Sequence, residues 1–250
     1  MPLAPLLPAA GRCANRPRDS PVIARRNRTA TFWQTDSAVQ LSRAAVILAG
    51  GRSSRMGQPK EWLEIDGEPL LHRVASAAAR ACPIVVVVAR AGQDLPPLPA
   101  GVTRVDDPPD HDGEGPLAAA LAGLAAVGDR GGEIAFVGAS DAPFVGEAHI
   151  AYVLDRLERD RTLMAVVPES GPFDDGTRIL NALGGAVRVT VARATAHALV
   201  QAGQRAIKTL YEGLAARRLA IASLPDPDAV LGCNTPDEWA RVLSGASRHA

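Results

Sequence analysis

Short, unbroken runs of aliphatic residues recur along the chain, and longer segments with a helical spacing of apolar positions lie between them. An unbroken run is typical of a strand that is covered on both faces, and the longer segments are typical of amphipathic helices. The runs predict strands over residues 45–48, 84–89, 102–105, 133–138 and 163–167. The segments between them predict helices over residues 70–81, 116–127 and 146–160.

This alternation of strands and helices predicts an α/β fold with three layers, in which a mostly parallel sheet carries helices on both faces. The pattern changes after residue 171. A polar turn or hairpin is expected over 171–178, a strand over 180–187, helices over 189–201 and 204–216, and a last strand over 218–224.

Residues 1–42 differ from the rest of the chain. They hold prolines at positions 2, 5, 8, 17 and 21 and arginines at positions 12, 16, 18, 25, 26 and 28. No period of 2 or 3.6 persists through them, so they are interpreted as a disordered tail or as the product of a misassigned start. The remaining residues, 43–250, are expected to form a single domain.

Composition narrows the class of protein. The chain of 250 residues has 47% hydrophobic residues, which supports a real core, and its net formal charge of zero gives no reason to expect a nucleic-acid partner. No segment approaches the ~20 apolar residues that a membrane helix needs. Cys13, Cys82 and Cys233 show neither metal-ligand spacing nor a disulfide framework, which suits a cytoplasmic protein.

The segment 45–60, AVILAGGRSSRMGQPK, places glycines and cations directly after the first strand. Gly50 and Gly51 allow backbone to approach a ligand, and Arg52, Arg55 and Lys60 make an anionic ligand the best match. Nucleotide phosphates suit such a loop. The segment is neither a dinucleotide fingerprint nor a Walker A loop, which disfavours an NAD-dependent oxidoreductase.

Acidic residues follow two other predicted strands. Asp107 comes after the strand 102–105, and Asp141 comes after the strand 133–138. Ligands of parallel sheets bind at the carboxyl ends of the strands, where Gly51, Asp107 and Asp141 can converge. Asp141 beside a phosphate loop can hold Mg²⁺, which prefers carboxylate and phosphate oxygens, although a turn aspartate can also cap the next helix. Asp107 can also belong to a solvated acidic loop.

The segment NTPDEW near the C-terminus has the letters of a helix start. Thr235 suits the N-cap, Pro236 the first helical position, and Glu238 the partner in a capping box. Asn234 lies just outside this cap and is therefore available to a ligand.

The sequence LAGGRSSRMGQPKEWLEIDGEPLL resembles the N-terminal signature of the molybdenum cofactor guanylyltransferase family, and the resemblance extends over residues 44–243. The signature's fixed points are matched by Leu48–Gly51, Arg55–Gly57, Lys60 and 67–70. The segment DAPF at Asp141 matches the family's metal-binding aspartate.

The resemblance implies a Rossmann-like nucleotidyltransferase fold, Mg²⁺ as cofactor, GTP as donor and molybdopterin or its molybdenum form as acceptor. It implies that the backbone of Leu48, Ala49, Gly50 and Gly51 holds base and ribose, and that Asp107 helps to hold the nucleotide. Lys60 contacts the α-phosphate, Arg55 the leaving pyrophosphate and Asp141 the metal. Asn234 belongs to the family's C-terminal Asn-Thr-Pro segment, which we place on the acceptor side.

The second half of the chain matches the family less closely. Val88, Ile179 and Gly232 stand where members often have polar residues. Alternatives of the same class are a cytidylyltransferase acting on the same cofactor and a sugar-phosphate nucleotidyltransferase. An alternative of another class is a nucleotide-binding module without transfer activity. The choice of nucleobase, the acceptor and the oligomeric state stay open at this point.

Overall fold

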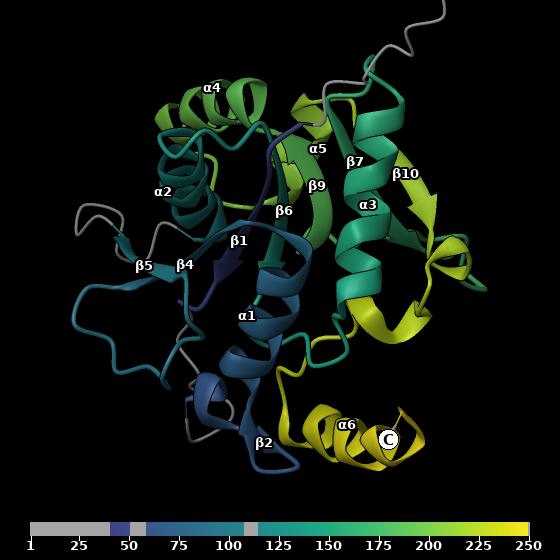
Figure 1. The fold of residues 1–250 in the computed structure, drawn as a ribbon. Coiled ribbons are helices and arrows are strands. Elements are labelled where there is room, and N and C mark those ends of the chain that lie inside the picture. Colours follow the sequence, from purple (N-terminus) through teal and green to yellow (C-terminus); the bar gives the residue numbers. More distant parts are fainter. Residues whose placement is uncertain (1–40, 51–58, 108–114, 250) are drawn as a thin grey trace, which may run out of the picture. The chain divides into compact units, whose positions relative to one another are not determined.

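A computed structural model of the chain describes residues 41–50, 59–107 and 115–249 (Figure 1). The chain divides into two units, Met1–Ala38 and Val39–Ala250, and every described residue belongs to the second. The tail predicted over residues 1–42 lies almost wholly outside the described residues. The prediction of a single domain over residues 43–250 therefore stays a prediction.

An eight-stranded sheet forms the centre of the second unit, with the order β10-β7-β9-β6-β1-β4-β5 and with β8 paired to β7. Its strands are β1 (Arg43–Leu48), β4 (Ile84–Arg90), β5 (Val102–Asp107), β6 (Ile134–Ala139), β7 (Ala165–Ser170), β8 (Ile179–Leu180), β9 (Gly184–Arg188) and β10 (Arg217–Ala220). Strands β6, β1, β4 and β5 are mutually parallel, as are β7 and β10. Strand β9 runs antiparallel to both of its neighbours. The predicted mostly parallel sheet is confirmed.

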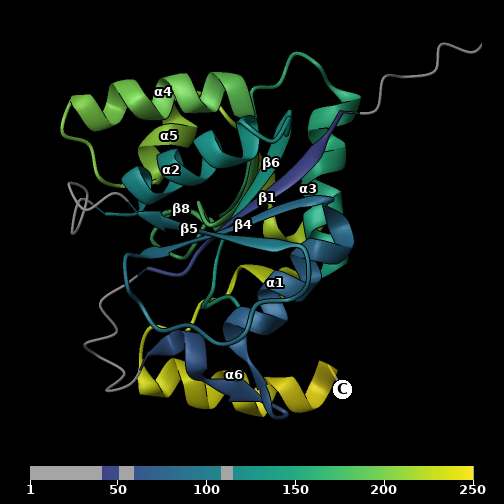
Figure 2. The same ribbon diagram turned by 60° about the vertical axis from the view of Figure 1, so that its left-hand side comes forward.

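Helices cover both faces of this sheet, as Figure 2 shows. The face that carries α1 (Leu70–Ala81) and α3 (Glu147–Arg159) buries one core, and the face that carries α2 (Pro116–Gly128), α4 (Val189–Gln201) and α5 (Lys208–Gly213) buries the other. Because side chains alternate along a strand, Ala45 and Ile47 of β1 enter the first core and Val46 enters the second. The predicted three layers are confirmed.

A third, smaller core lies at the C-terminal helix α6 (Pro236–His249), beside the hairpin of β2 (Glu64–Ile65) and β3 (Glu68–Pro69). Its buried residues are Leu63, Ile65, Leu70, Cys233 and Val242. This core holds the chain just after Lys60 against the chain just before α6, which matters for the site described below.

Three predicted elements differ from the structure. The predicted helix 204–216 is only α5, Lys208–Gly213, and the predicted strand 180–187 is divided into β8 and β9. The last strand ends at Ala220, where Ile221–Ser223 form a 3-10 turn. The sequence predicted that the strand ends at residue 105 and that Asp107 follows it. In the structure, Asp106 and Asp107 are the last two residues of β5.

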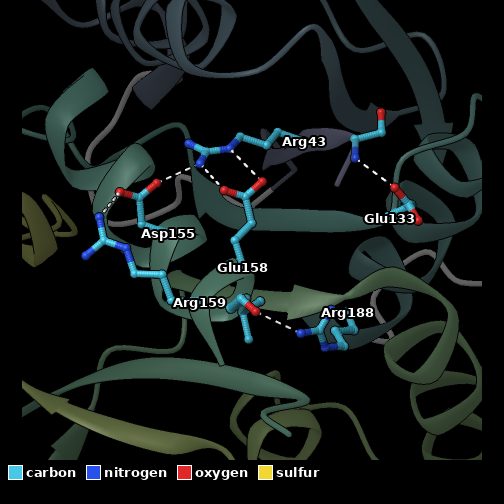
Figure 3. A network of polar contacts seen from close by, with 8 residues as sticks. Arg43, Glu133, Asp155, Glu158, Arg159 and Arg188 are labelled. Carbon is cyan, nitrogen blue, oxygen red and sulfur yellow. Dashed lines mark hydrogen bonds and ion pairs between the residues drawn. The ribbon is translucent and has the colours of Figure 1, made fainter. Parts of the chain in front are cut away.

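Ion pairs and hydrogen bonds connect the amino end of the sheet to α3, as Figure 3 shows at close range. Arg43, at the start of β1, contacts Asp155 (2.6 Å) and Glu158 on α3. Arg188, at the end of β9, donates hydrogen bonds to the backbone oxygens of Leu157, Asp160 and Leu163. These contacts tie α3 to two strands at the edge opposite the predicted ligand edge.

Among the described helices, none is long and apolar enough to cross a membrane. The described cysteines, Cys82 and Cys233, are buried and unpaired, and burial raises the pKa of the Cys82 thiol to about 12. Cys13 lies outside the described residues.

Candidate active site

Three segments that are far apart in the sequence meet at the ammonium group of Lys60. Its Nζ lies 2.9 Å from Oδ2 of Asp141 and 2.7 Å from Oδ1 of Asn234, residues that are 81 and 174 positions away. The side chains of Lys60 and Asp141 are 16% and 22% exposed, so the ion pair is largely withdrawn from solvent but remains reachable. The expected position of Asp141 beside the cationic loop is thus present in the fold, through the contact with Lys60.

Lys60 is positioned by a short 3-10 helix, η1 (Lys60–Trp62). Pro59, with φ −61°, precedes this helix, and the Lys60 backbone oxygen accepts a hydrogen bond of 3.1 Å from the N–H of Leu63. Leu63 and Ile65 then enter the small core beneath α6. Apolar burial on the C-terminal side of Lys60 therefore fixes where its side chain starts.

Asp141 lies in the turn that follows β6, at the carboxyl end of the sheet. Its backbone oxygen accepts a hydrogen bond of 3.0 Å from the N–H of Cys233, and the preceding Ser140 donates its N–H to the oxygen of Leu48. Burial, together with the charge of the nearby Asp141 carboxylate, raises the pKa of the Cys233 thiol to about 11. Cys233 is thus a neutral backbone anchor for Asp141 and not a nucleophile.

Asn234 is positioned by the cap of α6. The N–H of Glu238 donates to Oγ1 of Thr235 (3.2 Å), and the Glu238 carboxylate accepts from the N–H of Thr235 (3.1 Å) and of Asn234 (2.6 Å). The predicted capping box is present, and Pro236 is the first residue of the helix. This box leaves the Asn234 side chain to bind Lys60.

The glycine-containing segment begins where β1 meets the same edge. Leu48 and Ala49 are buried and Gly50 is exposed, whereas Gly51 and Arg55 lie outside the described residues. Ala49 donates its N–H to the oxygen of Val88 (2.8 Å) and accepts from the side-chain amide of Gln93 (2.9 Å). Both backbone groups of Ala49 therefore have partners within the protein.

Two polar residues in this region were not singled out from the sequence. Gln93 lies in the turn after β4, and Glu61 is the buried neighbour of Lys60. Burial raises the pKa of the Glu61 carboxyl, while a hydrogen bond with the Gln93 side chain opposes the rise. Gln93 thus links Ala49 with Glu61. The sequence could not predict this role, because Gln93 is a single polar residue in a loop rich in proline.

Asp107 lies at the same edge but does not join the group around Lys60. It is the last residue of β5 and pairs with Arg90 of β4, which places it two strands away from β1. Neighbouring strands are about 4.8 Å apart, so Asp107 is roughly 10 Å from the end of β1 along the edge. A role in holding the nucleotide remains a prediction for Asp107.

The oxygen donors around Lys60 fit a hard divalent cation. Asp141 supplies a carboxylate and Asn234 an amide oxygen, and both accept a hydrogen bond from Nζ of Lys60, a group that a metal-bound phosphate would draw away. Among the described residues, no three His, Cys, Asp or Glu side chains cluster as a complete metal cage. A Mg²⁺ site at a nucleotide commonly uses one or two carboxylates and completes its shell with phosphate oxygens and water.

Comparisons with known proteins identify relatives of this chain. The MobA-like NTP transferase domain family matches residues 45–224. Two of the relatives, each 32% identical to this chain, illustrate the match. The probable molybdenum cofactor guanylyltransferase of Mycobacterium tuberculosis aligns over 77% of this chain and 92% of its own length. The molybdenum cofactor guanylyltransferase of Rhodobacter capsulatus aligns over 80% of this chain and 94% of its own length.

A solved structure has the same fold. The molybdopterin-guanine dinucleotide biosynthesis protein A of Archaeoglobus fulgidus superposes with a TM-score of 0.63 and 20% identity, over 82% of this chain and 99% of its own. At that identity the similarity supports the fold, while the family follows from the match over residues 45–224 and from the two relatives. The chain belongs to the MobA-like NTP transferase family and is a nucleotidyltransferase.

Proposed function

We propose that the protein transfers GMP from GTP to the phosphate of molybdopterin, or of its molybdenum-bearing form, and releases pyrophosphate in a reaction that depends on Mg²⁺. The names of the relatives that are 32% identical support the donor and the acceptor. The observation that carries the proposal is the contact of Lys60 with Asp141 and Asn234 at the carboxyl edge of the sheet.

The acceptor needs no general base. A phosphate monoester has its second pKa near about 6 and is already largely ionised near neutral pH, so it can attack the α-phosphate directly. The protein must instead reduce repulsion between two anions and stabilise the charge that develops at the α-phosphate. A lysine beside a carboxylate and an amide oxygen meets that need.

Each residue then has a distinct task. Lys60 binds the α-phosphate oxygens, and the Asp141 carboxylate with the Asn234 amide oxygen holds Mg²⁺. When bound, Mg²⁺ neutralises charge on the phosphate oxygens and orients them. The predicted role of Asn234 on the acceptor side is compatible with this place, since it lies next to the reacting groups.

The remaining assignments rest on the family resemblance. Gly50, with Leu48, Ala49 and Gly51, is proposed to contact base and ribose, and Arg55 to contact the pyrophosphate. Because both backbone groups of Ala49 have partners in the protein, we expect the exposed Gly50 to make the closest backbone contact in the described part of the segment. Asp107 is proposed to bind the nucleotide farther along the edge.

The test is pyrophosphate release from GTP with molybdopterin and Mg²⁺. Lys60→Met and Asp141→Asn should each lower turnover by about 10²-fold or more, as the loss of single electrostatic groups does in other enzymes. Asp129→Asn is the matched control, because Asp129 is an exposed carboxylate that pairs with Arg193 at the end of α2. Wild-type turnover in both site variants, with folding intact, contradicts the proposal.

The same assay with CTP, UTP and ATP tests the choice of base. Faster turnover with CTP would replace the proposal by the cytidylyltransferase alternative. Binding of triphosphates without pyrophosphate release on any acceptor would support a nucleotide-binding module. A cytoplasmic location is also proposed, and it is supported by two buried cysteines that are not joined in a disulfide.

A further inference from the structure

Lys60 contacts the same two oxygens that the proposed function gives to a metal ion. Its ammonium nitrogen lies 2.9 Å from Oδ2 of Asp141 and 2.7 Å from Oδ1 of Asn234. An ammonium group and a hard metal ion compete for such oxygens, because both are cations that bind carboxylate and amide oxygens. Lys60 must therefore release these oxygens before a metal ion can use them.

The two oxygen donors are positioned by the backbone and not by Lys60. The backbone oxygen of Asp141 accepts a hydrogen bond of 3.0 Å from the N–H of Cys233. A Cβ atom added to Gly232 would lie 3.6 Å from Nδ2 of Asn234 and 3.8 Å from Oδ1 of Asp141. Both side chains thus lie against one short segment of backbone, so their closeness does not depend on Lys60.

Lys60 is the member of this group that can move most easily. Its backbone belongs to η1, but its ammonium group ends a flexible stem of methylene groups. The side chains of Lys60 and Asp141 are both partly exposed, so a ligand can reach their contact from solvent. Rotation about side-chain bonds can therefore carry the ammonium group from Asp141 to a nearby anion without a change in the backbone.

A metal ion without a nucleotide binds poorly in competition with Lys60. Among the residues that the structure describes, no three His, Cys, Asp or Glu side chains gather as a cage, and the ion would find one carboxylate and one amide oxygen. Mg²⁺ gives up its water reluctantly, and its charge would be repelled by that of the ammonium group. The competition thus favours Lys60 over the free ion.

A triphosphate changes both sides of this competition. Its oxygens can complete the shell of the metal ion, and its negative charge offers the Lys60 ammonium group another partner. When the ammonium group moves to the phosphates, the Asp141 carboxylate becomes available to the metal ion. Binding of one ligand therefore strengthens binding of the other, and a coupling of this kind is reciprocal.

We propose that Lys60 closes the cation site through its contacts with Asp141 and Asn234, so that a divalent cation enters together with a triphosphate and not before it. The phosphate oxygens open the site when they draw the ammonium group away. The inference rests on the proposed function, since it takes a triphosphate as the ligand of Lys60. Lys60 thus has two positions, one on Asp141 and one on the substrate, and the first excludes a metal ion that no nucleotide accompanies.

The experiment uses Mn²⁺ as the probe, because it prefers oxygen ligands as Mg²⁺ does and gives an electron paramagnetic resonance signal. The signal of free Mn²⁺ is followed as the ion is titrated into the nucleotide-free wild type, Lys60→Met and the double variant Lys60→Met/Asp141→Asn. Lys208→Met is the matched control, since Lys208 is an exposed lysine at the start of α5. Circular dichroism checks that each variant is folded.

Lys60→Met should bind Mn²⁺ alone at least about tenfold more tightly than the wild type, because a competing positive charge is removed from the carboxylate. The double variant should lose this gain, which assigns the ion to Asp141, and Lys208→Met should behave like the wild type. An unchanged affinity for Mn²⁺ in folded Lys60→Met overturns the proposal. An equal gain in Lys208→Met also overturns it, because the effect would then come from the net charge of the protein.

Equilibrium dialysis of the wild type gives a second test that does not depend on the folding of a variant. With GTP and no acceptor, the protein should retain Mn²⁺ and GTP together, whereas Mn²⁺ at the same concentration without GTP should not be retained. Equal retention of Mn²⁺ with and without GTP overturns the proposal. Absence of pyrophosphate release in the transfer assay would instead refute the proposed function, and the Mn²⁺ titrations without nucleotide would still decide whether Lys60 excludes a cation.

Discussion

Gln93 shows how one side chain can support the nucleotide segment without being part of it. Its amide nitrogen donates to the oxygen of Ala49 (2.9 Å), and its amide oxygen accepts from the N–H of Arg90 (3.2 Å). The guanidinium of Arg104 donates to the backbone oxygens of Gln93 (2.8 Å) and Arg90 (3.0 Å). The turn after β4 is thus held from β5, and it in turn holds the end of β1.

We expect Gln93→Leu to raise the KM for the triphosphate by about tenfold, the equivalent of a lost hydrogen bond of ~1.4 kcal/mol. The physical reason is that Ala49, directly before the exposed Gly50, loses its side-chain anchor. Steady-state kinetics check this result, and the KM for the acceptor should stay unchanged. Gln204→Leu, on an exposed turn after α4, is the control. An unchanged KM for the triphosphate would show that the Ala49 contact is dispensable.

His149 is a buried imidazole whose protonation would destabilise the folded state. Its Nε2 lies 2.9 Å from the oxygen of Gly184 and so carries the proton, whereas Nδ1 has no hydrogen-bond partner among the described residues. Burial lowers the pKa of His149, although the hydrogen bond to Gly184 and the charge of Asp226 oppose this. Protonation would therefore place a positive charge in a buried site, where the ring of Phe136 packs edge to face against the imidazole.

Because the folded pKa of His149 is depressed, the unfolded chain takes up the proton first, near about pH 6.5. Neutral His149 contributes its full share to the free energy of unfolding above that pH. This share is lost as the pH falls from the pKa of the unfolded state toward the lower pKa of the folded state. Thermal unfolding between pH 7.5 and 5 should show a smaller loss of Tm in His149→Gln than in the wild type. If Tm falls with pH by the same amount in the two proteins, His149 is not the cause of the loss of stability at low pH.

At the scale of elements, Arg43 connects β1 to α3 through two carboxylates (Figure 3). Its side chain is 18% exposed and contacts two carboxylates, Asp155 and Glu158, that would repel each other without it. We expect Arg43→Met to lower the free energy of unfolding by about 2 kcal/mol, less than the loss for a fully buried pair. Chemical denaturation measures this value.

Arg159→Met provides the comparison for Arg43. Arg159 contacts the same Asp155 at 3.2 Å, but its side chain is 75% exposed and lies one turn away on the same helix. Such pairs contribute about 0.3–0.5 kcal/mol. Equal losses in the two variants would contradict the view that burial decides the strength of these contacts.

Helix α2 packs closely on the sheet because Gly123 faces it. A Cβ atom at this position would lie 2.3 Å from Cγ1 of Val46 and 2.9 Å from Cγ2 of Val88, both buried and stiff at χ1. We expect Gly123→Ala to lower stability by about 2 kcal/mol, because overpacking exceeds the gain of about 1 kcal/mol in helix propensity. Gly146→Ala, where no atom lies within 4 Å, is the control for denaturant melts. Higher stability of Gly123→Ala would mean that α2 can shift outward.

Local signals predicted some elements well. The bounds of α1 and α4 agree with the sequence prediction because an apolar stripe ends before Pro83 in one case and before Gly203 in the other. The capping box of α6 was also found, since its residues act on their own neighbours. Where a helix starts and stops through local contacts, the sequence is informative.

Tertiary contacts overrode the pattern elsewhere. The helix expected from residue 204 does not begin there, because the oxygen of Arg205 accepts from Leu117 of α2. The strand expected over residues 180–187 breaks at Asn181, whose N–H bonds to Pro168 and whose side chain bonds to Ser170. The Gln93 contact also depends on strand order, which no local pattern contains.

At the scale of the whole molecule, the site depends on a main sheet and a small outlying core. Asp141 lies in the turn after β6 of the sheet, whereas Lys60 and Asn234 are positioned by the core of Leu63, Ile65, Leu70, Cys233 and Val242. Ion pairs alone give a weak connection between such parts. A ligand that binds residues from both should therefore stabilise the folded state as a whole.

Thermal unfolding with triphosphates and Mg²⁺ tests this linkage. A ligand at 100 times its Kd adds about 2.7 kcal/mol, which for a domain of this size raises Tm by roughly 5–10 °C. We expect GTP with Mg²⁺ to give that shift in the wild type and in Asp129→Asn, and to give little shift in Lys60→Met or Asp141→Asn. Because the shift depends on binding and not on transfer, it separates a failure to bind GTP from a failure to use the acceptor. Equal shifts with all four triphosphates would contradict selection of guanine.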